Sequence, residues 1–215
     1  MKRPSSLTKP TTGKVGTIVF DLETNGLLND ATRIHCVALH WGEDDRTEAF
    51  NDEPYGDGTL CIKEDAPMGG NYSITTALSY LEVADVLVGH NIVGFDIPII
   101  KRLYPWFNPR GTIVDTLLLS RLYHPNLLDI DQPKDKITGE RKPRWKHMPL
   151  QLQGRHSLEA YGYRLNEYKG NFGKTTDWKE WSQEMQDYCI QDVVVTTKLC
   201  KHFLPYLNGS KWSTR

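Results

Sequence analysis

The chain has 215 residues, of which 39% are hydrophobic and 25% charged, so it can form one sizeable core and has the composition of a soluble globular protein. No apolar run approaches the ~20 residues needed to span a bilayer, and no signal-type segment follows the basic N-terminus, so we expect a cytoplasmic protein without a membrane partner. The formal net charge of −1 excludes a uniformly basic nucleic-acid-binding surface, and four cysteines without a CxxC pair argue against a zinc site or a disulfide framework.

Three strands are predicted at the start of the chain, over residues 17–24, 34–41 and 46–51. The second and third are joined by a turn at Gly42–Asp45, so we expect a three-stranded antiparallel start. Residues 52–72 are rich in Gly, Pro and Asp and are predicted to form a loop.

Strands and helices alternate in the rest of the chain, except over residues 129–154, where all periodicity is lost. In chain order we expect a helix over Thr75–Val83, a strand over Val86–Gly89, a helix over Ile97–Leu103, a strand running into a helix over Thr112–Tyr123, a helix over His156–Leu165 and a long helix over about Trp178–Leu204.

This order of elements predicts an α/β fold in which a mixed α+β sheet is flanked by helices. No internal repeat or interior linker is visible in the sequence. We therefore expect one domain over residues 16–207, with a flexible N-terminal tail over 1–15 and a C-terminal tail over 208–215.

Two carboxylates close the first predicted strand, in the stretch IVFDLETNGL. Because side chains alternate along a strand, Asp21 and Glu23 point to one face and Leu22 points to the other, into the core. The end of a strand is where α/β sheets tend to place their sites. The alternative is an exposed strand end with two solvated acids.

A third acid, Asp96, follows in the stretch HNIVGFDIP. It could be an ordinary helix cap, since Pro98 stands in the first turn. His90 and Asn91 follow a predicted buried strand and could line a cleft or only satisfy the loop backbone, and for His90 we expect the structural role.

A fourth acid lies on the predicted long helix. Tyr188 and Asp192 are four residues apart and share a face with the apolar Met185, Val195 and Leu199. A tyrosine on such a face is usually part of the core, but an aspartate there should be paired or bound to a cation.

The four acids, if they converge, require a cation to neutralise them. Hard oxygen ligands favour Mg²⁺ or Mn²⁺. Two such ions ~4 Å apart suit in-line displacement at phosphorus, where the attacking and the leaving oxygen both need charge neutralised.

These residues resemble the motifs of the DEDD 3′→5′ exonucleases, a superfamily with an RNase H-like fold. FDLETNG, HNIVGFD and YCIQD match its three motifs in order. A tyrosine four residues before the last aspartate marks one branch and a histidine five before it the other. Here Tyr188 and Asp187 occupy those positions, so the resemblance is to the tyrosine branch.

A longer resemblance covers about residues 17–207. VDTLLLSRLYHPNL, GRHSLEAYGYRLNEYKG and EMQDYCIQDVVVTTKL are similar to the proofreading exonuclease domain of short-tailed-phage family A DNA polymerases. The chain ends just after the helix that carries Asp192 and has no polymerase motifs, so no polymerase activity is expected. The tail and the 52–72 loop look longer than in the phage pattern.

The resemblance implies an exodeoxyribonuclease that removes nucleoside 5′-monophosphates from single-stranded, frayed or mismatched DNA 3′ ends. It would act alone or as a detached proofreading subunit with a separate DNA polymerase or replication protein, in a bacterial or phage-infected cytosol. The alternatives are an exoribonuclease of the same branch and a non-catalytic nucleic-acid-binding module, the latter predicting the loss of an acid, which is not seen.

The resemblance also implies roles for the site residues. Asp21, Glu23 and Asp192 would hold the first metal, and Asp21 would bridge to a second metal near Asp96. Glu23 and the Tyr188 hydroxyl would aim the nucleophile; with a reference pKa near 10, tyrosine is not expected to be the base. The expected substrate contacts are Leu22, Thr24, Asn25, Leu27 as a wedge, Asn91 and Phe95. For Leu27 and Phe95 the alternative is a core position, and for Asp115 we expect a helix cap.

A basic segment interrupts the predicted elements. Residues 134–146 hold six Lys or Arg against two acids, a net charge of +4. They could form a solvated flexible loop, or an arm that follows phosphates while a base stacks on its tryptophan. The candidate arm residues are Lys142, Arg144, Trp145 and Lys146.

Overall fold

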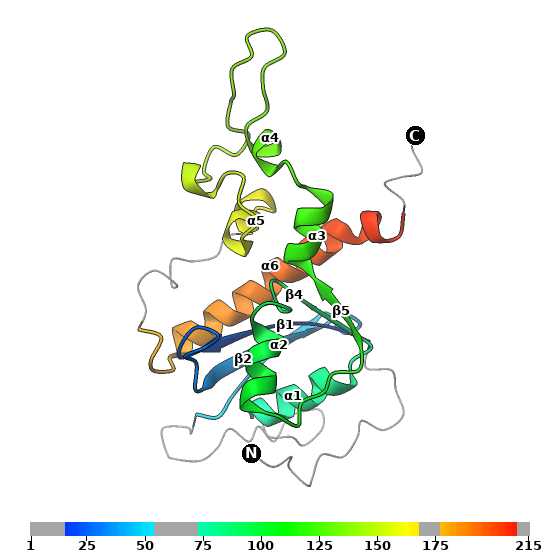
Figure 1. Cartoon of the computed structure of the whole chain (residues 1–215), viewed down its shortest axis with the longest axis vertical. Helices are drawn as coiled ribbons and strands as arrows, with labels where there is room; N and C mark the ends of the chain where they lie inside the picture. Colours follow the sequence, from blue (N-terminus) through cyan, green and yellow to red (C-terminus); the bar gives the residue numbers. More distant parts are fainter. Residues whose placement is uncertain (1–15, 54–72, 168–176, 210–215) are drawn as a thin grey trace.

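Five strands form one mixed sheet in the order β3-β2-β1-β4-β5 in a computed structural model that describes residues 16–53, 73–167 and 177–209 (Figure 1). The antiparallel start is confirmed, because β1 pairs with β2 and β2 with β3 in antiparallel register. β4 lies parallel to β1, and β5 parallel to β4. The strands are β1 (Thr17–Thr24), β2 (Ile34–Trp41), β3 (Arg46–Asn51), β4 (Val86–Gly89) and β5 (Thr112–Asp115).

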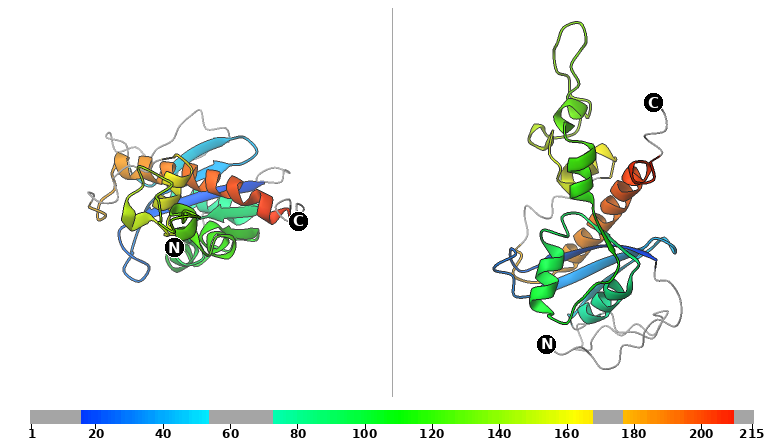
Figure 2. Two further views of the ribbon diagram at one scale, coloured as in Figure 1. Left: turned by 90° about the horizontal axis from the view of Figure 1, so that it is seen from above. Right: turned by 45° about the vertical axis from the view of Figure 1, so that its right-hand side comes forward.

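The two faces of the sheet are covered by different helices, and the side chains of β1 point alternately to one face and to the other. Ile18, Phe20 and Leu22 are buried against α1 (Ile74–Val83) and α2 (Asp96–Leu103). Val19 faces the other way, into the cluster formed with α6 (Gln183–Leu207). Asp21 and Glu23 share the face of Val19, so the sheet presents both carboxylates to α6, which crosses β1 and β2 (Figure 2).

Three short helices pack beside the sheet, on the second half of α6. α3 (Thr116–Tyr123) follows β5 directly, and α4 (Leu127–Asp131) and α5 (Leu158–Arg164) come next in the chain. Leu127 of α4 and Leu158 of α5 are buried in one cluster with the C-terminal half of α6. These helices form the part of the molecule above the sheet in Figure 1, which is held to the sheet through α6.

The predicted helices exist, but the predicted start of the long helix is wrong. The long helix begins at Gln183, not near residue 178, because the Ser182 hydroxyl accepts a hydrogen bond from the N–H of Met185 and caps it. The segment predicted to lack periodicity holds α4 and a single 3₁₀ turn, Leu150–Leu152. Neither is long enough to show a helical period.

The mixed sheet flanked by helices confirms the predicted fold class. The N-terminal tail, most of the 52–72 loop and most of the C-terminal tail lie outside the described residues, so the domain bounds stay a prediction. None of the helices in the described part of the chain is long and apolar enough to cross a membrane.

Candidate active site

A cavity of about 210 Å³ opens where β1 ends, between the start of α2 and the middle of α6. It gathers the four predicted acids and the predicted tyrosine, which come from three separate parts of the chain. The lining residues are Asp21, Leu22, Glu23, His90, Asn91, Phe95, Asp96, Trp178, Tyr188 and Asp192.

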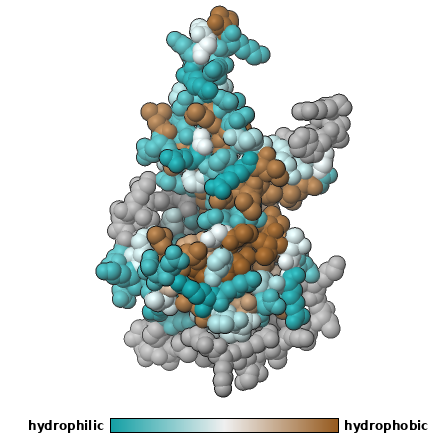
Figure 3. Space-filling view, viewed as in Figure 1, coloured by the Kyte–Doolittle hydropathy of each residue, from teal (hydrophilic) through white to brown (hydrophobic). Residues whose placement is uncertain are grey.

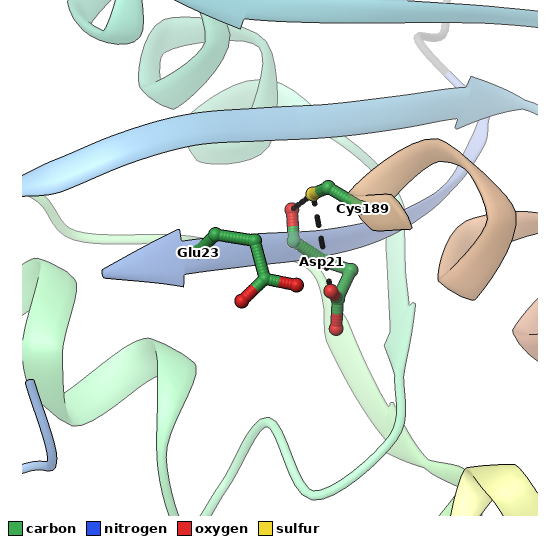
Figure 4. A group of neighbouring side chains, drawn as sticks. All are labelled: Asp21, Glu23 and Cys189. Carbon is green, nitrogen blue, oxygen red and sulfur yellow. Dashed lines mark hydrogen bonds between the residues drawn. The ribbon is translucent and has the colours of Figure 1, made fainter. Parts of the chain in front are cut away.

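The pair at the end of β1 forms one wall of this cavity. Ligand atoms of Asp21, Glu23 and Cys189 lie within 4.8 Å of one another, so the two carboxylates are close enough to share one cation. Figure 4 shows the two carboxylates on one side of β1, with Cys189 of α6 beside Asp21. The reading of a solvated strand end therefore does not describe this pair.

Cys189 is part of this wall although the sequence gives it no special place. Its Sγ lies 3.5 Å from the Asp21 carbonyl oxygen and 3.9 Å from Asp21 Oδ2. Burial, the neighbouring Cys36 and then the two carboxylates raise the pKa of the Cys189 thiol well above its ordinary value. The protonated thiol therefore donates to Asp21 and helps to fix it.

Asp96 is a deeply buried acid of the cavity, and its pKa is strongly raised. It is 3% exposed and begins α2, but it is not the helix cap, which is Phe95. Burial is the main cause that raises the pKa of Asp96 to about 7; the charges of Asp115 and Asp192 add to the rise, and hydrogen bonds from the N–H groups of Asp96 and Leu22 oppose it. An ionised carboxylate in this position is costly unless a cation neutralises it.

Tyr188 stands at the cavity with its ring held by a residue that the sequence did not single out. The edge of the Trp178 ring meets it, with centroids 6.4 Å apart and planes at 72°. The Trp178 carbonyl in turn accepts a hydrogen bond from Nε2 of the buried His35, 3.0 Å away. Trp178 was predicted to lie in the long helix; it precedes the Ser182 cap, which frees it to turn toward Tyr188.

The connection from β4 to α2 supplies a polar rim. His90 Nδ1 lies 3.0 Å from the hydroxyl of Thr116, which agrees with a structural role, although His90 also lines the cavity. Asn91 has a left-handed backbone, with φ of 66°. The Asp115 carboxylate accepts from the N–H groups of Asn91 and Val93, each at 3.0 Å.

Asp115 also caps α3, as predicted, by accepting from the N–H groups of Leu117 and Leu118. One carboxylate thus fastens the rim of the cavity to the start of the next helix. Its contacts are those of a structural residue rather than of a ligand open to the cavity.

Three of the predicted substrate contacts do not line the cavity. The Thr24 hydroxyl donates to the Gly26 carbonyl at 2.7 Å. The Asn25 side chain is bound to Thr32 and to the backbone N–H of residue 33. Leu27 is 74% exposed, so the core alternative for it is wrong, and its role as a wedge stays a prediction.

A second cavity, of about 540 Å³, shares His90 and Asn91 with the first. Its far wall carries two arginines, Arg121 and Arg155, and His156. The two cavities thus meet at a common rim; the first contains four acids and the second two arginines.

The sheet order, with a central strand crossed by a long helix, is that of an RNase H-like fold. No protein-family model matches the chain. The sequence is 29% identical over 218 residues to the DNA-directed DNA polymerase of Enterobacteria phage T3, covering 87% of this chain and 27% of the polymerase. The chain therefore spans about a quarter of that relative, and the predicted resemblance to DEDD exonucleases of the phage-polymerase kind is confirmed.

Two solved structures support the fold. Brucella melitensis NrnC with bound Mg²⁺ matches with a TM-score of 0.54 and 16% identity over 91% of this chain and 75% of that one. The family B DNA polymerase of Pyrobaculum calidifontis matches with a TM-score of 0.52 and 16% identity over 89% of this chain and 25% of that one.

Proposed function

We propose that the chain is a divalent-metal-dependent 3′→5′ exonuclease that removes nucleoside 5′-monophosphates from DNA ends. The observation that carries this proposal is the gathering of Asp21, Glu23, Asp96 and Asp192 with Tyr188 around one small cavity. Acids from β1, α2 and α6 that face one another repel and destabilise the fold, so the needs of the fold alone do not explain their arrangement.

The donor set fits Mg²⁺ or Mn²⁺, because it consists of carboxylate oxygens and the Cys189 thiol beside them is protonated. Asp21, Glu23 and Asp192 would hold one ion, and Asp21 with Asp96 a second. The ions would neutralise charge on the scissile phosphate and lower the pKa of a water molecule.

The chain's own groups would orient the reactants. The Tyr188 hydroxyl, with its ring set by Trp178, would hold the attacking water in line with the phosphorus. Glu23 would accept a hydrogen bond from the same water. His90 and Asn91, on the rim between the two cavities, would contact the terminal nucleotides.

DNA is proposed as the substrate because the phage relative is named as a DNA polymerase. NrnC, solved with bound Mg²⁺, supports metal use only through the shared fold. A direct binding assay with candidate polymerases would test whether the chain acts alone or beside a separate polymerase.

The test is digestion of 5′-labelled DNA and RNA strands of the same sequence, with Mg²⁺ or with EDTA. We expect a ladder that shortens from the 3′ end of DNA, needs Mg²⁺ and stops when the 3′ hydroxyl is blocked. Asp21→Asn with Glu23→Gln should lose roughly 10³-fold or more of the rate without a change in fold. Full activity in that double variant would refute the site, and faster cleavage of RNA would refute the substrate.

Tyr188→Phe and Asp187→Asn make a matched pair for the nucleophile-positioning role. Asp187 precedes the tyrosine, is exposed and accepts a hydrogen bond from Gln183 at 2.9 Å. We expect roughly a tenfold or greater loss of kcat for Tyr188→Phe and no loss for Asp187→Asn. The reverse result would show that the residue five before the last aspartate matters instead.

A further inference from the structure

We propose that residues 132–146, the cationic hairpin, grip the phosphodiester backbone of the single strand several nucleotides upstream of the 3′ end in the acid-lined cavity. The hairpin projects beyond α4, away from the sheet, in Figures 1 and 2. Its surface in Figure 3 is mostly hydrophilic. The inference rests on the proposed nuclease function and names a substrate contact outside the catalytic cavity.

The base of the hairpin is anchored on one buried acid, Asp131, which is 0% exposed. Its carboxylate accepts from Arg164 Nε and Nη2 at 2.9 and 2.7 Å, from the Gly154 N–H at 2.7 Å and from Trp145 Nε1 at 3.0 Å. Burial alone would raise the pKa of Asp131, but these donors hold it below its ordinary value. Both ends of the hairpin are therefore fixed to the body, because the Asp131 carbonyl also accepts from the N–H of Arg144.

Trp145 belongs to this anchor. Its ring is half buried and packs on the cluster of Met148, Leu152 and Ala160. A tryptophan held in this way supports the arm rather than offering both faces to a base. The predicted stacking on Trp145 is therefore not part of the proposal.

The outer part of the hairpin has its own hydrogen bonds. Lys134 and Arg141 form an antiparallel bridge. The Asp135 carboxylate accepts from the N–H groups of Ile137 and Thr138 at 2.9 and 2.8 Å, which closes the turn. A turn of this kind presents its side chains in a defined arrangement, unlike a solvated loop.

Most of the positive charge of the hairpin is not neutralised by acids of the described residues around it. Arg141 bonds Asp129 Oδ1 at 2.6 Å and the Gln132 carbonyl at 2.9 Å, so it serves the structure. The remaining five cations are exposed, and none forms an ion pair with another residue of the described ranges. They are Lys134, Lys136, Lys142, Arg144 and Lys146. Exposed cations on a fixed projection are suited to a polyanion.

A continuous wall joins the hairpin to the acid-lined cavity. Gly154, which bonds Asp131, also lines the second cavity, and that cavity carries Arg121 and Arg155 and shares Asn91 with the first. A strand whose 3′ end lies among the acids can follow this wall to the foot of the hairpin.

The length of the hairpin sets the substrate that can reach it. The chain from Asp131 to Ile137, which is 94% exposed near the tip, spans at most roughly 20 Å at ~3.3 Å per residue. A stacked strand rises ~3.4 Å per nucleotide, so the hairpin lies alongside roughly six nucleotides. A substrate of four nucleotides fills the cavities but does not reach the outer cations.

The experiment compares binding of fluorescein-labelled dT4 and dT20 in EDTA by anisotropy, over 50 to 300 mM KCl. The five exposed cations are changed together to Gln. For a single strand log K falls with log salt by ~0.7 per neutralised phosphate, so the slope for dT20 should become shallower by about 2 to 3.5. The affinity for dT20 at 100 mM salt should fall at least tenfold, and that for dT4 should change less than twofold.

A matched pair removes the effect of net charge. Lys136→Gln with Lys142→Gln takes two charges from the hairpin, and Lys101→Gln with Lys201→Gln takes two exposed charges from α2 and α6. Only the first pair should weaken dT20 binding, and thermal melting checks that every variant folds. Equal effects of the two pairs, an unchanged dT20 slope, or equal losses on dT4 and dT20 would overturn the proposal.

Hydrolysis of both oligonucleotides with Mg²⁺, measured in parallel, separates this proposal from the one it rests on. If the wild-type chain cleaves neither, the nuclease proposal fails, while the binding slopes still decide the role of the hairpin. If the hairpin variant cleaves dT4 normally and dT20 more slowly at subsaturating concentration, both stand.

Discussion

Replacing Asp96 by Asn should stabilise the metal-free protein at pH 8, although it removes a proposed metal ligand. The carboxyl is buried, and its pKa is raised to about 7 from 3.8, mainly by burial. A raised acid pKa means that the folded state holds a proton that the unfolded state releases between about pH 4 and 7. The stability of the metal-free wild type therefore falls as pH rises through that window and stays low above it.

The size of the effect follows from the shift. About three pH units at 1.36 kcal/mol each give an upper limit of about 4 kcal/mol. Because Asp115 and Asp192 share the perturbation, and the amide accepts the N–H bonds less well than the carboxylate, we expect about 1–3 kcal/mol. For a chain of this length that corresponds to a rise in Tm of about 3–10 °C.

The assay is thermal melting in EDTA at pH 5 and pH 8, with Asp115→Asn as the matched control. Asp115 is also buried, but its carboxylate accepts four backbone N–H bonds, and an amide with one acceptor oxygen cannot keep them all. We expect Asp96→Asn to stabilise, more at pH 8 than at pH 5, and Asp115→Asn to destabilise at both. Ten millimolar Mg²⁺ should raise the Tm of the wild type by more than that of Asp96→Asn, which keeps only the site formed by the other three acids.

The reasoning is refuted if Asp96→Asn lowers the Tm in EDTA at pH 8 as much as Asp115→Asn does. That result would make the Asp96 carboxylate a structural acceptor rather than a group whose charge destabilises the metal-free fold.

Three other substitutions test the positioning groups. Asp131→Asn should cost about 3–5 kcal/mol by urea unfolding, because it leaves the buried Arg164 guanidinium without its counter-charge; a cost below 1 kcal/mol would contradict the anchor. Trp178→Ala should lower kcat, but not further in a Tyr188→Phe background, since both changes act on one hydroxyl; additive losses would contradict this coupling. Cys189→Ala should keep the Mg²⁺-dependent rate within about threefold and cost about 1 kcal/mol of stability, because the thiol donates and does not ligate; loss of Mg²⁺ dependence would make it a ligand.

Local pattern predicted the elements well where it was strong. The bounds of β1, β2 and β3 were predicted correctly because each strand is bounded by turn residues and carries β-branched or aromatic side chains. The start of α6 was missed because Trp178 and Trp181, which precede the helix, continue the spacing of its apolar residues. A single hydrogen bond from the backbone to Ser182 decides that boundary, and periodicity does not register it.

The residues that position the site were the ones missed. Cys189 reads as one more apolar residue on the buried stripe of α6, and Trp178 as a helical residue. Asp131 is one of several acids in an aperiodic segment, and its partner Arg164 lies 33 positions away. These roles arise from tertiary contacts between distant segments, for which a single sequence carries no local signal.

Asp96 and Asp115 show how such roles can be separated once a structure exists. Both are buried aspartates at the start of a helix, and for each the local sequence alone allows a helix cap. The fold gives Asp115 four backbone donors, so its charge is satisfied without help. It places Asp96 in a cavity with three other carboxylates and leaves its pKa near 7. A buried acid that its own fold satisfies holds the structure together. A buried acid that its fold penalises indicates a ligand that the chain does not itself contain, and the carboxylate oxygens of this cavity support the divalent cation proposed here.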